Sequence, residues 1–161
     1  MKGIAEPIAV GTVVAGTLDL SAAILSAWIL KGQSAGDVLR GIAAGPFGDV
    51  MRDGGPLAAL AGLIIHYGIM AVIAAVFMIA ARARPALVRH PVPIGLAYGA
   101  LTYIVMYWIV LPARWPAIFP ITTPSSVLLS LAFQLFFVGL PIALIAARYQ
   151  MRGLERDSTA S

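Results

Sequence analysis

Four long apolar stretches constrain this chain more strongly than any other feature. They cover residues 8–30, 57–81, 93–111 and 125–147. A helix of about 20 residues crosses the hydrocarbon core of a bilayer, and a helix satisfies all of its own backbone hydrogen bonds there. We therefore predict an all-α, polytopic membrane four-helix bundle. It forms a single transmembrane domain over residues 1–150, followed by a polar cytoplasmic tail over residues 151–161.

The overall composition agrees with a membrane protein. Hydrophobic residues make up 60% of the chain and charged residues 11%, and there are no cysteines. Soluble domains carry about a quarter charged residues. The lack of cysteine excludes disulfides, thiolate metal sites and cysteine nucleophiles. The net charge of +4 comes from basic residues at the ends of the apolar stretches, so we expect a lipid bilayer with anionic headgroups as the partner, and no nucleic acid.

The distribution of lysine and arginine predicts the orientation. Four spans place both termini on one side, together with the connection between the second and third spans. That side carries seven basic residues: Lys2, Arg82, Arg84, Arg89, Arg148, Arg152 and Arg156. The other side carries four: Lys31, Arg40, Arg52 and Arg114. The positive-inside rule therefore predicts both termini in the cytoplasm.

The first connection, residues 31–55, contains the signals of a short helix. Ser34 is a good N-cap, and Asp37 favours the first turn. An apolar face is formed by Val38, Leu39, Ile42 and Ala43. We predict a short interfacial helix between the first two spans, which runs through Ala44 and is stopped by Gly45-Pro46.

Two ionisable residues lie inside the predicted spans. Asp19 and His66 fall within a turn of the same depth, at a rise of about 1.5 Å per residue. A carboxylate inside the membrane costs roughly 3 kcal/mol or more. Asp19 and His66 are therefore expected either to share a proton or to make separate packing hydrogen bonds. The second histidine, His90, lies at the opposite edge, so no metal or haem site is predicted.

The other two spans add polar groups at a similar depth. They are Thr102 and Tyr103 in the third span and Ser130 and Gln134 in the fourth. We predict that all six residues face inward as one intramembrane polar site. This layer is either a functional site or a set of interhelical hydrogen bonds, each worth only about 0.6 kcal/mol on average. Pro141 predicts a kink in the fourth span.

No catalytic residue is predicted, because no serine sits in a nucleophile motif and no glycine-rich phosphate loop is present. The sequence indicates no particular cofactor. Three function classes stay open: a small transporter or channel-like protein, a structural or accessory subunit of a membrane complex, and a lipid- or quinone-linked membrane enzyme. The first requires a homo-oligomer, because four helices enclose little space.

Four short segments carry a resemblance to known proteins. They are Gly16-Thr17-Leu18-Asp19, Gly41-Ile42-Ala43-Ala44-Gly45, Leu63-Ile64-Ile65-His66-Tyr67 and Val138-Gly139-Leu140-Pro141-Ile142-Ala143. In this order they resemble an uncharacterised group of small bacterial four-helix inner-membrane proteins, over residues 11–148. The resemblance implies the fold and a bacterial inner-membrane location, and it implies no activity. That group often has histidine where this chain has Gln134, which argues against a two-histidine ligand site here.

Overall fold

The computed structural model describes residues 3–158, with side chains as far as Met151. Within this range the chain is helical and contains no strand. In chain order the elements are α1 (Ala5–Lys31), α2 (Ala35–Phe47), the 3-10 turn η1 (Asp49–Asp53), α3 (Pro56–Ala83), the 3-10 turn η2 (Pro85–Val88), α4 (Pro91–Val105), the π-helical η3 (Met106–Val110), α5 (Leu111–Arg114), α6 (Pro124–Phe133), the π-helical η4 (Gln134–Gly139) and α7 (Leu140–Ser158).

The predicted all-α fold is confirmed, and each predicted span falls within a long helix. In the described part of the chain, four helices are long and apolar enough to cross a membrane: Ala5–Lys31, Pro56–Ala83, Pro91–Arg114 and Pro124–Met151. Each extends a few residues beyond its apolar stretch. The third continues past Leu111, through Pro112, to Arg114. The helical path of the fourth continues to Ser158, into the predicted tail.

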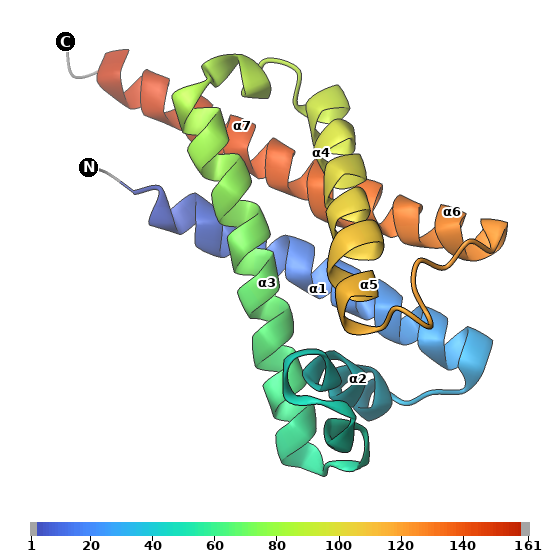
Figure 1. Cartoon of the computed structure of the whole chain (residues 1–161). Helices are drawn as coiled ribbons and strands as arrows, with labels where there is room; N and C mark the ends of the chain where they lie inside the picture. Colours follow the sequence, from blue (N-terminus) through green and yellow to red (C-terminus); the bar gives the residue numbers. More distant parts are fainter. Residues whose placement is uncertain (1–2, 159–161) are drawn as a thin grey trace.

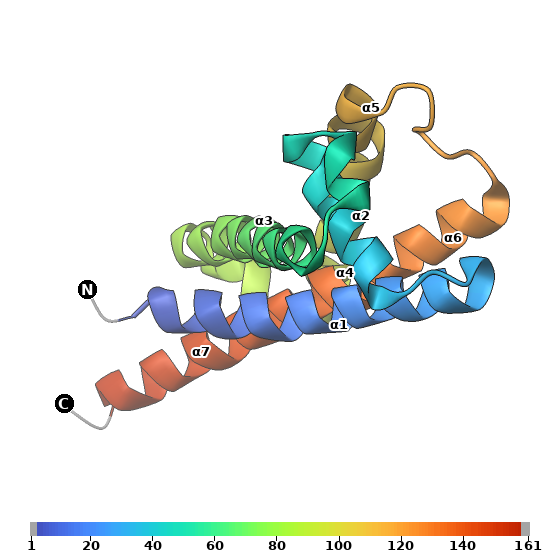
Figure 2. The ribbon, with the colours of Figure 1, turned by 90° about the horizontal axis from the view of Figure 1, so that it is seen from below.

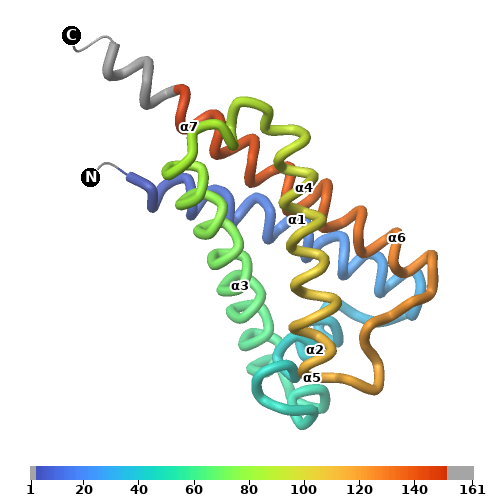
Figure 3. The backbone as a smooth tube through the Cα atoms, turned by 45° about the horizontal axis from the view of Figure 1, so that its top comes forward, coloured from blue at the N-terminus to red at the C-terminus, as the bar shows by residue number. Residues whose placement is uncertain are grey.

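The spans form two layers. α1 lies alongside the fourth span, and α3 and α4 cross over this pair on one face (Figures 1 and 3). The two ends of the chain and η2 lie at one end of the bundle (Figure 1), whereas α2 and α5 lie together at the other (Figure 2). This arrangement agrees with an even number of membrane crossings. The side that faces the cytoplasm stays a prediction from the basic residues.

Three glycines allow α4 to touch the backbone of the fourth span. A Cβ atom on Gly139 would lie 2.1 Å from the carbonyl oxygen of Gly95. A Cβ atom on Gly99 would lie 2.3 Å from the carbonyl oxygen of Gln134. Any side chain at these positions would force the helices apart. Small residues at helix contacts are typical of membrane proteins, because association there depends on close packing rather than on a hydrophobic driving force.

A π-helical turn lies just before Pro141, where the sequence predicts a kink. One residue, Leu140, separates η4 from Pro141, and one residue, Leu111, separates η3 from Pro112. A proline ring collides with the carbonyl group four residues earlier and offers it no N–H. The extra residue in a π turn relieves this conflict, and such turns are frequent at functional sites.

α2 begins as predicted but ends later. Ser34 Oγ accepts a hydrogen bond from the backbone N–H of Asp37 at 3.2 Å, and Asp37 Oδ2 accepts from the N–H of Ser34 at 2.8 Å. This reciprocal capping box fixes the start of the helix. The predicted end at Ala44 is wrong, because the helix runs through Pro46 to Phe47. Arg114 donates from Nε to the Gly45 carbonyl oxygen at 2.8 Å, which supplies a donor near the helix end.

α2 also packs on protein. Ala43 and Ala44 are fully buried. A Cβ atom on Gly62 of α3 would lie 1.9 Å from the carbonyl oxygen of Leu39, so the backbones of α2 and α3 are in close contact. Part of the predicted lipid-facing surface therefore faces α3. The position of α2 at the membrane surface stays a prediction.

Gly139 and Gly68 provide a matched test of the glycine contact. We expect Gly139→Ala to lower the free energy of unfolding by about 1–3 kcal/mol, because its Cβ has no room beside Gly95. No atom lies within 4 Å of a Cβ on Gly68 of α3, so Gly68→Ala should leave the stability equal or slightly higher. Unfolding in mixed detergent micelles, followed by circular dichroism, measures both. Equal losses in the two variants would contradict the close contact.

The start of α2 should loosen in acid. Hydrogen bonds from the Ser34 hydroxyl and backbone N–H, assisted by Arg40, lower the pKa of Asp37 below its ordinary value of 3.8. The folded form thus favours the charged carboxylate. The stabilisation that the charged Asp37 gives to the start of α2 is complete above pH 3.8. It is lost as the pH falls through the lower pKa that Asp37 has in the folded protein. Amide hydrogen exchange at Val38 should accelerate over this range, beyond its intrinsic change with pH, in the native chain and not in Asp37→Asn.

Candidate functional site

Asp19 lies near the middle of α1 and is half-buried. Within the described residues its carboxylate receives no hydrogen bond. Two side chains lie within range of electrostatic interaction with it: His66 of α3 and Tyr107 of η3. Asp19 therefore lies in the part of α1 that is near both α3 and the third span, and its oxygens are still open to a donor.

His66 makes a packing hydrogen bond instead of a direct bond to Asp19. Its ring is only 8% exposed, and Nε2 lies 2.9 Å from the carbonyl oxygen of Gly16. A carbonyl oxygen can only accept, so Nε2 carries the hydrogen. A Cβ atom on Gly16 would lie 2.9 Å from the ring of Tyr67, so glycine allows this approach. Of the two arrangements expected for Asp19 and His66, the structure has separate hydrogen bonding, with the two groups close enough for their charges to interact.

Tyr107 belongs to the site although it was not among the predicted site residues. Its ring stacks on that of Tyr103 with centroids 4.9 Å apart, and its hydroxyl is within hydrogen-bonding reach of Ser130. The spacing of four residues from Tyr103 is the signal that could have found it, because residues at that spacing share one helix face.

Thr102 and Gln134 join α4 to the fourth span. Both are buried, with exposures of 7% and 6%. Thr102 Oγ1 lies 2.8 Å from the carbonyl oxygen of Gly99 and 3.1 Å from Gln134 Oε1. The single hydroxyl hydrogen is shared between two acceptors. This pair lies directly beside the glycine contact, which brings the two helices close enough for the bond to form.

The six predicted residues thus divide into two groups. Asp19 and His66 lie together, and Tyr107 connects Asp19 to Tyr103 and Ser130. Thr102 and Gln134 form a separate, self-contained pair. Across the described residues, no three histidine or acidic side chains converge on a point where they could hold a metal ion.

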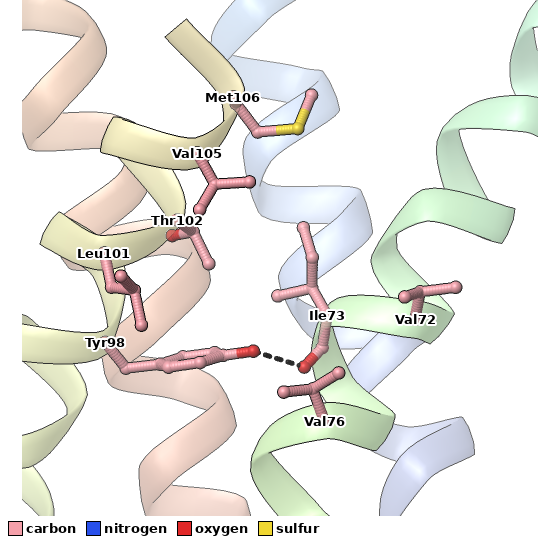
Figure 4. Close-up of a pocket in the computed structure, with 8 residues that line it drawn as sticks. All are labelled: Val72, Ile73, Val76, Tyr98, Leu101, Thr102, Val105 and Met106. Carbon is pink, nitrogen blue, oxygen red and sulfur yellow. Dashed lines mark hydrogen bonds between the residues drawn. The ribbon is translucent and has the colours of Figure 1, made fainter. Parts of the chain in front are cut away.

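A cavity of about 220 Å³ lies between α3 and α4 (Figure 4). Its walls are formed by Val72, Ile73, Val76, Tyr98, Leu101, Thr102, Val105 and Met106. The Tyr98 hydroxyl donates to the carbonyl oxygen of Ile73 at 2.7 Å and bridges the two helices. Val72 and Val76 are more than half exposed, so the cavity reaches the apolar outer surface.

No protein-family model, curated protein or solved structure matches this chain. The resemblance to small bacterial four-helix proteins therefore stays a prediction. The chemistry of the site rests on its own residues: an acid without a donor, an imidazole, a phenol and a hydroxyl, brought together from all four spans.

The Thr102–Gln134 bond predicts an asymmetry between two single substitutions. Thr102→Val leaves the buried Gln134 oxygen without its donor, so we expect a loss of about 1–3 kcal/mol in unfolding free energy. Gln134→Leu leaves Thr102 bonded to Gly99, so the loss should be smaller. The double variant should be no less stable than Thr102→Val alone. Additive losses, measured by unfolding in detergent, would show that the two side chains do not interact.

Proposed function

We propose that this chain is a small transporter or channel-like protein of the bacterial inner membrane, with both termini in the cytoplasm, and that Asp19 is its proton- or cation-binding group. The observation that supports the proposal is the open carboxylate of Asp19, which lies inside a span and receives no hydrogen bond from the described residues. Ionisable groups inside membranes most often mark ion or proton pathways.

The energetic cost of Asp19 supports a bound proton or cation. An ionised carboxylate at mid-membrane costs roughly 3 kcal/mol or more, which a proton or cation removes. The groups around it suit proton movement, because an imidazole, a phenol and a hydroxyl each accept and donate hydrogen bonds. We assign these roles to His66, Tyr107 and Ser130, which lie beside Asp19 or one contact from it.

The small size of the bundle favours an oligomer. Four helices enclose little space, and the cavity beside the site has apolar walls. We therefore place the polar pathway at a contact between protomers of a homo-oligomer, with one Asp19 site in each protomer.

A structural or accessory subunit of a larger membrane complex is the second candidate. It is favoured by the bonds of His66, Thr102 and Gln134, all of which are made within the chain. Hydrogen bonds between buried polar groups of neighbouring helices hold the helices together without a ligand. The two candidate functions differ in the role of Asp19, which binds a proton or cation only in the transporter.

Flux measurements on reconstituted protein test the transport proposal. Asp19→Asn removes the charge with little change in shape, and we expect it to reduce proton flux into proteoliposomes by about tenfold or more, which corresponds to at least ~1.4 kcal/mol. His66→Gln keeps an N–H donor for Gly16 and removes the imidazole ring, so it should also lower the flux. A pH-sensitive dye inside the vesicles reports the flux.

The control for these variants is Asp53→Asn. Asp53 is an exposed acid in η1, outside the spans, and its substitution should leave the flux unchanged. If Asp19→Asn and His66→Gln also leave the flux unchanged, the transport proposal is wrong. Purification as part of a larger complex in mild detergent would then favour the accessory subunit.

A further inference from the structure

We infer that the ligand of the Asp19 site is an amphipathic organic cation that reaches it from the bilayer, between α3 and α4. Its apolar chain occupies the cavity between these helices, and its ammonium N–H donates to the Asp19 carboxylate. The inference rests on the proposed function, because it names the substrate class of the same site.

The size of the cavity fits a short apolar chain. Its volume of about 220 Å³ exceeds the roughly 150 Å³ at which an apolar protein cavity binds benzene. The α3 and α4 ribbons stand apart on either side of it (Figures 1 and 4). Its opening on the outer surface of the spans means that a molecule dissolved in the hydrocarbon can enter without crossing water.

The walls of the cavity leave no polar group for the ligand's chain. Two of the lining side chains carry hydroxyl groups, Tyr98 and Thr102. The Tyr98 hydrogen is donated to Ile73, and that of Thr102 is shared between Gly99 and Gln134. The remaining lining side chains are aliphatic or methionine, so this part of the ligand must be apolar.

The polar end of the site lies close to the cavity. Met106, which lines the cavity, directly precedes Tyr107, whose side chain interacts with Asp19. On the opposite wall, His66 lies two turns of α3 from Ile73, or about 10 Å along the axis. The α1 helix, which carries Asp19, passes behind the gap between α3 and α4 (Figure 4). A chain of about eight carbons has the length to run from the cavity along α3 to the level of His66, with which Asp19 interacts.

The chemistry of Asp19 selects a cation with an N–H group. An ionised carboxylate only accepts hydrogen bonds, and no described residue donates one to Asp19. A neutral alcohol would supply a donor but leave the charge, and a quaternary cation would supply charge but no donor. A protonated amine supplies both.

Contacts at both ends of the gap favour the sideways route. At one end, Arg114 ties α5 to α2 through its bond to Gly45. At the other end, the rings of Phe77 and Tyr98 pack across the gap with centroids 4.9 Å apart. The opening between these two contacts faces the bilayer.

Protection of Asp19 from chemical modification tests this inference. Dicyclohexylcarbodiimide modifies protonated carboxyl groups in apolar surroundings, and the intact mass of the full chain in proteoliposomes reports the reaction. We expect labelling in the native chain and none in Asp19→Asn. N,N-dimethyloctylammonium should slow the labelling about tenfold or more, equivalent to ~1.4 kcal/mol. Trimethylammonium, which lacks the chain, and 1-octanol, which lacks the charge, should each protect far less.

Two tryptophan variants of α4 test the cavity. Leu101 lines it and is 52% exposed, whereas Ile104 is 51% exposed and is not among the lining residues. Leu101→Trp fills the cavity, so we expect it to raise the half-protecting concentration of dimethyloctylammonium about tenfold. Ile104→Trp adds the same bulk to the lipid-facing surface and should leave that concentration unchanged. Each value is normalised to the variant's own labelling rate without amine.

Each contrary result overturns a specific part of the inference. Equal protection by 1-octanol would exclude a cation, equal protection by trimethylammonium would exclude the apolar chain, and equal behaviour of the two tryptophan variants would exclude the cavity. Loss of proton flux in Asp19→Asn without amine protection would uphold the proposed function and overturn this inference. Amine protection of the native chain, together with unchanged proton flux in Asp19→Asn, would uphold the amine-binding site and overturn the transport proposal.

Discussion

The direct backbone contact between α4 and the fourth span decides where the other helices lie. Gly95 and Gly99 place α4 against Gly139 so closely that no Cβ atom fits between them. α4 is thereby held to the fourth span instead of to α3, and the space between α3 and α4 stays open (Figure 1). The same approach brings Thr102 to Gln134. In lipid, where apolar side chains gain nothing by leaving the solvent, such contacts determine which helices pair.

Two of the prolines inside helices shape the site from a distance. Pro112 and Pro141 each follow a π-helical turn, and these turns contain Tyr107 and Gln134. A π turn rotates the residues within it relative to a regular helix, because it holds more residues than an α-helical turn. The two prolines thus place Tyr107 and Gln134 in turns whose geometry departs from that of an α-helix.

The polar groups inside the membrane have unequal roles because their hydrogen bonding is unequal. His66, Thr102 and Gln134 are bonded within the chain and hold helices together. Asp19 interacts with His66 and Tyr107 through charge but receives no hydrogen bond from the described residues. An acid in that condition requires a proton, a cation or a donor from outside the chain. The open side of the bundle lies where such a ligand can reach it.

The sequence by itself determined the four long apolar helices, the position of both chain ends at one end of the bundle and the capped start of α2. These follow from length, hydropathy and the fixed rise of a helix, all of which are local. Only the tertiary structure decided that His66 bonds to Gly16, that Tyr107 joins Asp19, and that α3 and α4 stand apart. Depth follows from counting residues, but the rotation of each helix and its choice of neighbour depend on how the surfaces of several helices fit together.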